Sequence, residues 1–157
     1  ESTEVYDRQT VIGAVMLFDR EKFNQCGGFD ENIFLYFEEI DLCKRIVEQG
    51  HRILFCPGVL LEHVGCGSSG HSEYVSALRS WHMAWSKAYF LRKHHFHAKL
   101  FKEYSLIFPA RLCKRLWYWL TNNRDMFNKY RASTNGTWNS LIGRKAFDQN
   151  DNPKSIH

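Results

Sequence analysis

Three carboxylates lie within four positions of one another in the stretch FLYFEEIDLCKRI, residues 34–46. Glu38, Glu39 and Asp41 follow an aromatic run and open an amphipathic segment. A carboxylate held in a pocket can act as the general base for a substrate hydroxyl group. All three side chains are therefore candidate catalytic residues, and the geometry of a helix separates them.

With about 100° per residue, the hydrophobic side chains of this segment share one helical face. They are Ile40, Leu42, Cys43, Ile46 and Val47. Asp41 and Arg45 fall on the opposite face, where their spacing predicts an ordinary i,i+4 surface ion pair. Glu38 lies at the boundary of the faces, whereas Glu39 lies in the middle of the apolar one. Glu39 is therefore the carboxylate that is out of place.

Two interpretations of Glu39 stay open at this point. The carboxylate can cap the first helical turn, where exposed N–H groups and the helix dipole favour negative charge. Alternatively, the turn projects Glu39 into a pocket lined by Phe34, Tyr36 and Phe37, where it takes a proton from a substrate hydroxyl. Helical geometry alone does not choose between them.

His63 is a second candidate, because it follows the apolar stretch VLLE and precedes the glycine-rich loop VGCGSSG. A histidine at a strand end beside such a loop suits metal ligation, although a lone histidine is more often structural. Cys56, His63, Cys66 and His71 form an alternative zinc set. Their spacing does not match the common paired pattern of zinc ligands.

The remaining segments predict an α/β order with a helical end. We expect a buried strand over 10–18, a short helix from Asp19, a glycine turn over 26–31 and a helix over 38–49 ending at Gly50. Two strands, 51–56 and 59–64, flank a turn at Pro57-Gly58. A long helix starts at Ser72 as N-cap and ends at Lys93. The region 98–131 reads as mostly helical with a break at Pro109, and the helical signal weakens from Ala132.

Composition and charge limit the function classes. The chain has 157 residues, 44% of them hydrophobic, which suits a packed globule. Five cysteines without a Cys-x-x-Cys pair favour free thiols in a reducing compartment. No apolar run is long enough to cross a membrane. The N-terminus has no signal-peptide pattern, and we expect the chain to be part of a longer one.

Charge is unevenly distributed along the chain. Residues 1–63 carry 12 acidic and 6 basic side chains, whereas residues 87–131 carry 2 acidic and 11 basic ones. In the basic region Leu112, Cys113, Leu116, Trp117 and Leu120 share one helical face, and Arg111, Lys114 and Arg115 lie opposite. Such a helix suits the surface of an anionic membrane. The alternative is a helix packed on its own domain with its basic face in water.

The order of motifs carries a family resemblance. It consists of Val11-x-Gly13, Gly27-Gly28-Phe29-Asp30-Glu31, then the stretch 34–42, Arg45, Gly50, Pro57, His63 and Ser68. This order resembles the C-terminal, acceptor-side part of a family 2 glycosyltransferase, in the style of rhamnosyltransferase-like and galactofuranosyltransferase-like bacterial members. The resemblance is dense from Ile12 to about Ser69 and weaker beyond.

The resemblance implies an α/β fold, namely the C-terminal half of a GT-A domain with a mixed sheet flanked by helices. Residues 1–97 would form the acceptor and catalytic half, 98–146 a basic amphipathic helical region, and 147–157 a flexible tail. The family transfers a sugar from a nucleotide-sugar with inversion, as a carboxylate deprotonates the acceptor hydroxyl. The nucleotide-binding half of such an enzyme is missing from this chain.

The resemblance also assigns site residues. Glu39 takes the base position, within the catalytic group Glu38, Glu39 and Asp41. Family members usually have Asp where this chain has Glu39, and one extra methylene shifts the carboxylate by about an ångström. Candidate substrate-binding positions are Gly13, Gly28, Asp30, Tyr36 and Phe37. The alternatives are that Gly28 shapes a turn, that Asp30 is structural, and that Tyr36 and Phe37 belong to the core. His63 matches a ligand of the divalent metal, Mn or Mg, which is expected only together with an Asp-x-Asp motif that is absent here.

The implied partners are a nucleotide-sugar donor and a glycan or lipid-linked acceptor, with peripheral contact to a membrane. The implied location is the cytoplasm, at the inner face of the cell membrane. No recognisable module surrounds the basic and aromatic stretch 90–104, so we expect no nucleic-acid partner. The main alternative is a metal-free half-domain that binds glycans or a partner protein without catalysis. The sequence does not indicate the oligomeric state.

Overall fold

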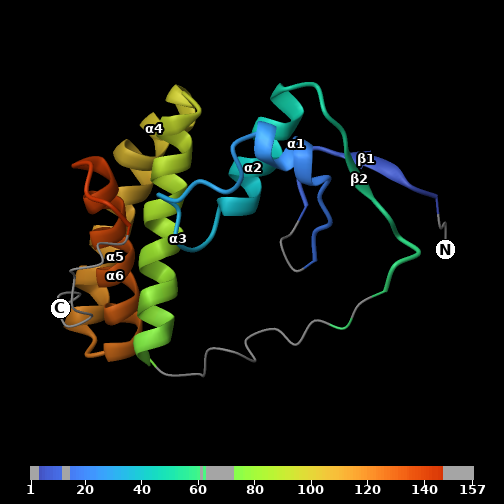
Figure 1. Ribbon diagram of the computed structural model, residues 1–157. Helices are drawn as coiled ribbons and strands as arrows, with labels where there is room; N and C mark the ends of the chain where they lie inside the picture. Colours follow the sequence, from blue (N-terminus) through green and yellow to red (C-terminus); the bar gives the residue numbers. More distant parts are fainter. Residues whose placement is uncertain (1–3, 12–14, 61, 63–72, 147–157) are drawn as a thin grey trace. The chain divides into compact units, whose positions relative to one another are not determined.

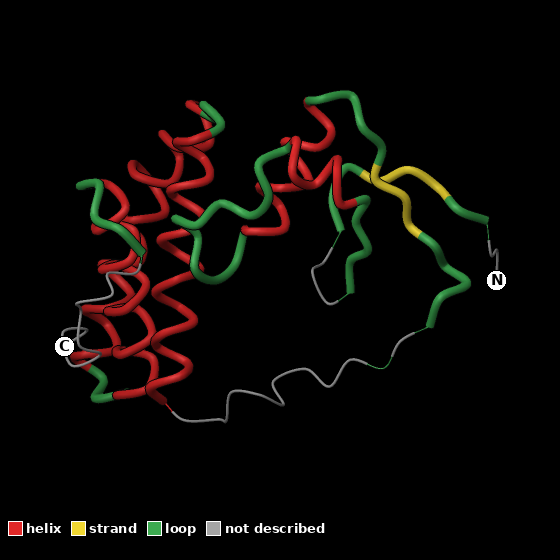
Figure 2. The backbone as a smooth tube through the Cα atoms, in the orientation of Figure 1, coloured by secondary structure: helices red, strands yellow, loops and turns green. Residues whose placement is uncertain are grey.

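The computed structural model describes residues 4–11, 15–60, 62 and 73–146. Within these ranges the protein is mostly helical, and strand is confined to two short segments, coloured yellow in Figure 2. The chain forms two compact units. The first contains residues 1–31 and 37–67, and the second contains residues 32–36 and 68–157. This division reflects which segments pack together. It does not test the domain boundaries expected from the sequence, which stay predictions.

The first unit contains a small antiparallel sheet. Strand β1 (Tyr6–Arg8) pairs with β2 (Ile53–Phe55), and Tyr6 lies opposite Phe55 (Figure 1). The rings of Tyr6 and Phe55 are 5.3 Å apart between centroids, which is a favourable cross-strand pair. Arg52 donates two hydrogen bonds of 2.8 Å to the Asp7 carboxylate beside the sheet. The strand predicted over 51–56 is thereby confirmed.

Two helices complete this unit. Helix α1 (Arg20–Gln25) begins after Asp19, whose side chain accepts hydrogen bonds from the N–H groups of Glu21 and Lys22, as an N-cap should. Helix α2 (Glu38–Glu48) buries Leu42 and Cys43. Gly50 follows α2 with a φ of 80°, the left-handed backbone that favours glycine at a helix end. Both helices are confirmed.

Two predicted strands are wrong in the described residues. Thr10, Val11 and residues 15–18 form no strand, and Leu17 is fully exposed rather than buried. Residues 59, 60 and 62 form no strand either, and Leu60 is 91% exposed. An apolar run becomes a strand only where a neighbour pairs with its backbone groups, and the structure shows no partner strand for either described stretch.

The second unit is helical. It contains α3 (Glu73–Lys93), α4 (His97–Lys102), the π-helical segment η1 (Glu103–Ile107), α5 (Phe108–Leu120) and α6 (Arg124–Leu141). The long helix α3 packs along α6, and α5 packs on α6 (Figure 1). Trp85 is buried in α3 and donates a 2.9 Å hydrogen bond to the carbonyl of Arg144. The predicted helix ending at Lys93 is confirmed, and its proposed N-cap Ser72 lies outside the described residues.

The C-terminal helices differ from the prediction in two places. Pro109 lies in the first turn of α5, and the irregularity precedes it, as the N–H of Phe108 bonds to the carbonyl of Glu103 five residues back. A π-helical turn thus replaces the predicted break, because proline supplies no N–H there. Helix α6 also continues through residues 132–141, which the sequence did not predict.

Gly136 explains why α6 forms despite its weak helical sequence. A Cβ atom at Gly136 would lie well inside van der Waals contact with the carbonyl oxygen of Trp81 on α3. The missing side chain lets the two helices approach closely, with Thr137 and Ser140 fully buried nearby on α6. Packing against α3 therefore outweighs the low helix propensity of this glycine- and threonine-containing stretch.

Candidate functional site

The candidate site is the first turn of α2, which the backbone enters in an unusual way. Tyr36 and Phe37 both have positive φ angles, 64° and 70°, immediately before the helix. Aromatic residues seldom adopt this left-handed conformation, which costs of order 1–3 kcal/mol per residue. Phe37 is the N-cap and offers no side-chain hydrogen bond to the first turn. Strain of this kind persists where the surrounding structure enforces it, and it is frequent at functional sites.

Glu38 and Glu39 follow this strained entry as a pair of half-buried carboxyl groups. The Oε2 atom of each is buried without a hydrogen-bond partner among the described residues. Burial raises the pKa of Glu38, and the neighbouring Glu39 carboxyl raises it further, against a hydrogen bond from the Glu38 backbone N–H that lowers it. Buried, unpaired carboxylate oxygens beside a strained turn are typical of a site that awaits a proton or a ligand.

Asp41 corrects the sequence prediction. Its side chain is fully buried, not part of a surface ion pair. Arg45 contacts the Asp41 carboxylate at 2.9 Å through Nε and 2.8 Å through Nη2. The helical wheel missed this because it does not show which other segments pack against the helix. Asp41 therefore holds the Arg45 guanidinium inside the first unit, and its assignment to the catalytic group stays a prediction.

Arg45 joins α2 to the glycine turn. Its guanidinium donates to the carbonyl of Cys26 and, at 2.6 Å, to the carbonyl of Gly28. One arginine thus donates hydrogen bonds to a carboxylate on its own helix and to two carbonyls of a turn 17 to 19 residues earlier. Hydrogen bonds to a charged group are among the stronger ones in proteins. The signal in the sequence was the Gly27-Gly28 pair upstream of the Asp41-x-x-x-Arg45 spacing, which the helical wheel alone does not connect.

The glycine turn requires both glycines. Gly27 and Gly28 have φ angles of 77° and 61°, which side chains disfavour. A Cβ at Gly28 would also meet the Phe23 ring at 3.3 Å. Gly28 therefore shapes the turn that Arg45 holds, while its predicted contact with substrate stays a prediction. Asp30 follows the turn and is half-buried.

Several predicted site residues cannot be placed. Gly13 and His63 lie outside the described residues, as do Cys66 and His71 of the alternative zinc set. Among the residues that the structure describes, no three His, Cys, Asp or Glu side chains gather as a metal site. Cys56 is exposed. Of the predicted site residues, Glu38 and Glu39 thus lie together in one helical turn. The predicted metal ligand His63 lies outside the described residues.

A model of the family described as "Glycosyltransferase like family 2" matches residues 2–88. The match covers more than half of the chain, so the chain belongs to this family. It includes the glycine turn, the strained entry and α2. No solved structure matches the chain.

Two relatives are rhamnosyltransferases. The N-acetylglucosaminyl-diphospho-decaprenol L-rhamnosyltransferase of Mycobacterium tuberculosis is 36% identical over 58 residues, which cover 37% of this chain and 19% of the relative. Rhamnosyltransferase WbbL of Escherichia coli K12 is 31% identical over 96 residues, which cover 61% of this chain and 36% of the relative. The chain therefore spans only a minor part of the length of these relatives.

Proposed function

We propose that this chain forms the acceptor side of an inverting glycosyltransferase. The enzyme would move a sugar, rhamnose in the first instance, from a nucleotide-sugar to a glycan or lipid-linked acceptor in cell-surface polysaccharide synthesis. The family match supports a transferase, and the two rhamnosyltransferases support the sugar. The observation that carries the proposal is the strained turn that presents Glu38 and Glu39, each with a buried oxygen that lacks a partner.

Glu39 is the general base in this proposal. Its carboxylate takes the proton of the acceptor hydroxyl while that oxygen bonds to the anomeric carbon of the donor sugar. The bond from the anomeric carbon to the diphosphate breaks, and the nucleoside diphosphate leaves with the electron pair. Glu38, whose pKa burial and Glu39 raise, keeps its proton to higher pH than an ordinary glutamate. The two neighbouring carboxyls thereby divide the roles, as paired carboxylates in active sites do.

The remaining groups position this pair. Arg45, held by Asp41, fixes α2 against the glycine turn, so the first helical turn has little freedom to shift. Precise placement matters because small displacements of a catalytic group cost large factors in rate. Tyr36 and Phe37 directly precede the pair in the sequence, and they are the residues that we propose for stacking on a sugar ring.

A divalent metal, Mn or Mg, belongs to the proposal only together with an Asp-x-Asp motif from a nucleotide-binding half. The described residues contain no cluster of three metal ligands, so this part of the chain does not by itself fit the metal. His63 is the residue of this chain that we propose as a ligand. When bound, the metal would stabilise the negative charge of the departing diphosphate. The location we propose is the cytoplasm, at the inner face of the cell membrane.

The test is a substitution of the base in the full-length protein encoded by the reading frame that contains this chain. Glu39→Gln should lower turnover by roughly 10²- to 10⁴-fold and leave the dissociation constant of the nucleotide-sugar nearly unchanged. Glu39→Asp tests placement, since the shorter side chain should retain part of the activity. Glu48→Gln is the matched control, because Glu48 ends the same helix and its side chain is 55% exposed.

Unchanged turnover in Glu39→Gln would remove Glu39 from the base position. Absence of transfer in the unsubstituted full-length protein, with retained binding of acceptor glycan, would instead favour the non-catalytic binding module.

A further inference from the structure

Helix α5 turns its polar face inward. Arg111 donates hydrogen bonds to Glu103 at 2.8 Å and to Thr137 on α6 at 2.9 Å. Tyr118 stacks on Tyr130 of α6 with 5.5 Å between ring centroids. The basic and tyrosine face of α5 therefore makes the contacts with the rest of the second unit. This overturns the expectation that a packed α5 would keep its basic face in water.

The apolar face of α5 is exposed as a consequence. The exposed fractions are 41% for Leu112, 57% for Leu116, 62% for Trp117 and Trp119, and 65% for Leu120. A helix that packs on its own domain normally buries its apolar stripe. Contiguous exposed apolar surface of this kind marks an interaction site. We name these five residues the α5 apolar face.

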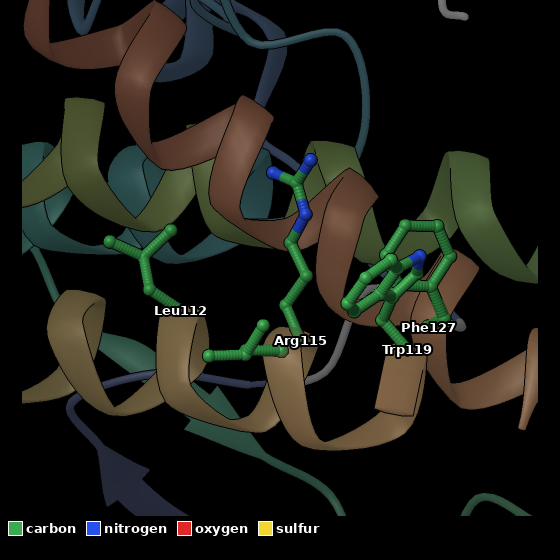
Figure 3. Close-up of a pocket in the computed structure, with 5 residues that line it drawn as sticks. Leu112, Arg115, Trp119 and Phe127 are labelled. Carbon is green, nitrogen blue, oxygen red and sulfur yellow. The ribbon is translucent and has the colours of Figure 1, made fainter. Parts of the chain in front are cut away.

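The α5 apolar face borders an open groove of about 330 Å³. Leu112, Arg115, Leu116, Trp119 and Phe127 line it. Figure 3 shows Arg115 reaching from α5 toward α6. The guanidinium of Arg115 lies 5.7 Å from the centre of the Phe127 ring, so a cationic group lies beside an aromatic ring in the lining of the groove.

The net charge of the second unit indicates what kind of partner binds the α5 apolar face. In the described part of the second unit, fourteen Lys and Arg side chains stand against three Asp and Glu. One of the three acids, Glu103, is fully buried and paired with Lys87 at 2.6 Å and with Arg111. Lys99 and Lys102 are exposed on the helical stretch that leads into α5. The partner must therefore be anionic as well as apolar.

We propose that the α5 apolar face docks on the surface of an anionic lipid bilayer. The helix would lie in the plane of the interface, with leucines in the acyl region, Trp117 and Trp119 at headgroup depth and lysines on lipid phosphates. No described helix is long and apolar enough to span a bilayer. A second copy of this chain would bring the same positive charge to the contact and be repelled. The inference deepens the membrane location given under the proposed function and does not depend on the transfer of a sugar.

Vesicle flotation of the full-length protein encoded by the reading frame that contains this chain tests the proposal. We expect binding to vesicles of phosphatidylcholine mixed equally with phosphatidylglycerol, and little binding to phosphatidylcholine alone. Leu116→Ser combined with Leu120→Ser should lower the ratio of bound to free protein at least about tenfold, because two leucines leave the acyl region. Salt at roughly 1 M should also release the protein, since charges are then screened within about 3 Å.

Leu54→Ser combined with Leu60→Ser is the matched control, because these leucines are 49% and 91% exposed in the first unit. This variant should bind vesicles like the unsubstituted chain, and circular dichroism should show that both variants are folded. The proposal is overturned by failure to bind anionic vesicles or by binding that the α5 variant leaves unchanged. It is also overturned by a dimer in light scattering that the α5 variant dissociates while vesicle binding is absent.

Discussion

Asp41→Asn is the substitution that best separates catalysis from positioning in this protein. Asp41 is one of three carboxylates that the motif groups together, yet its side chain is fully buried against Arg45. The variant keeps the shape of the side chain and removes its charge. If Asp41 acts by holding Arg45, the variant should lose stability as well as activity.

The expected loss of stability in Asp41→Asn follows from the burial of the Asp41 side chain. Removing one partner of a fully buried ion pair costs about 3–5 kcal/mol. The Arg45 side chain is 18% exposed and keeps the carbonyls of Cys26 and Gly28 as acceptors, which lowers the expected cost to about 2–3 kcal/mol. At about 2–4 °C per kcal/mol for a chain of this size, the melting temperature should fall by roughly 5–10 °C.

Thermal unfolding followed by circular dichroism measures the effect, and the same helix provides the control. Lys44 and Glu48 form an i,i+4 pair at 2.6 Å that is partly exposed, so Glu48→Gln should change stability by no more than about 0.5 kcal/mol. A double-mutant cycle of Asp41→Asn with Arg45→Gln should show coupling of about 1–3 kcal/mol. Unchanged stability of Asp41→Asn together with lost turnover in the full-length protein would refute the positioning role.

Two further predictions concern the second unit. Gly136→Ala should destabilise the second unit by about 1–3 kcal/mol in thermal unfolding, because the methyl group forces α6 away from Trp81 of α3. Lys129→Ala, on the exposed side of α6, is the control and should be nearly neutral. Equal effects of the two substitutions would contradict the close approach of α6 to α3 at Gly136. Burial lowers the pKa of His82 to about 4 from its usual 6.5, so the native state resists protonation; stability should be fully present above pH 6.5 and fall at up to about 1.4 kcal/mol per unit as pH drops from 6.5 toward 4. His82→Phe should flatten this part of the profile, and parallel curves for the two proteins would count against it.

The local signals of the sequence predicted local structure well. The start of a short helix at Asp19, Gly50 after α2 and the Pro57-Gly58 turn all occur where the sequence predicts them, because helix ends and turns depend on a few adjacent residues. The wheel also placed Leu42 and Cys43 on the buried face correctly. Strand prediction failed over the described parts of 10–18 and 59–64, since a strand depends on a partner that local sequence does not specify.

The sequence predicted only part of the candidate site as well. Helical phase alone singled out Glu39, and the family match covers the segment that contains it. The strain at Tyr36 and Phe37 had no local signal, because positive φ in aromatic residues is imposed by surrounding structure. Likewise, spacing predicted that Asp41 and Arg45 meet, but not that two carbonyls from the glycine turn would complete the arginine's hydrogen bonds.

The sequence by itself determined the family, the bounds of α2, the C-terminal end of α3 and the amphipathic pattern of α5, since these depend on residue type and spacing along the chain. Tertiary structure decided which faces are buried. It placed Asp41 inside and let α6 form around Gly136. It also turned Arg111 and Tyr118 of α5 toward α6 and left its leucines exposed. Periodicity identifies two faces of a helix, whereas burial is set by whatever other segment supplies matching contacts.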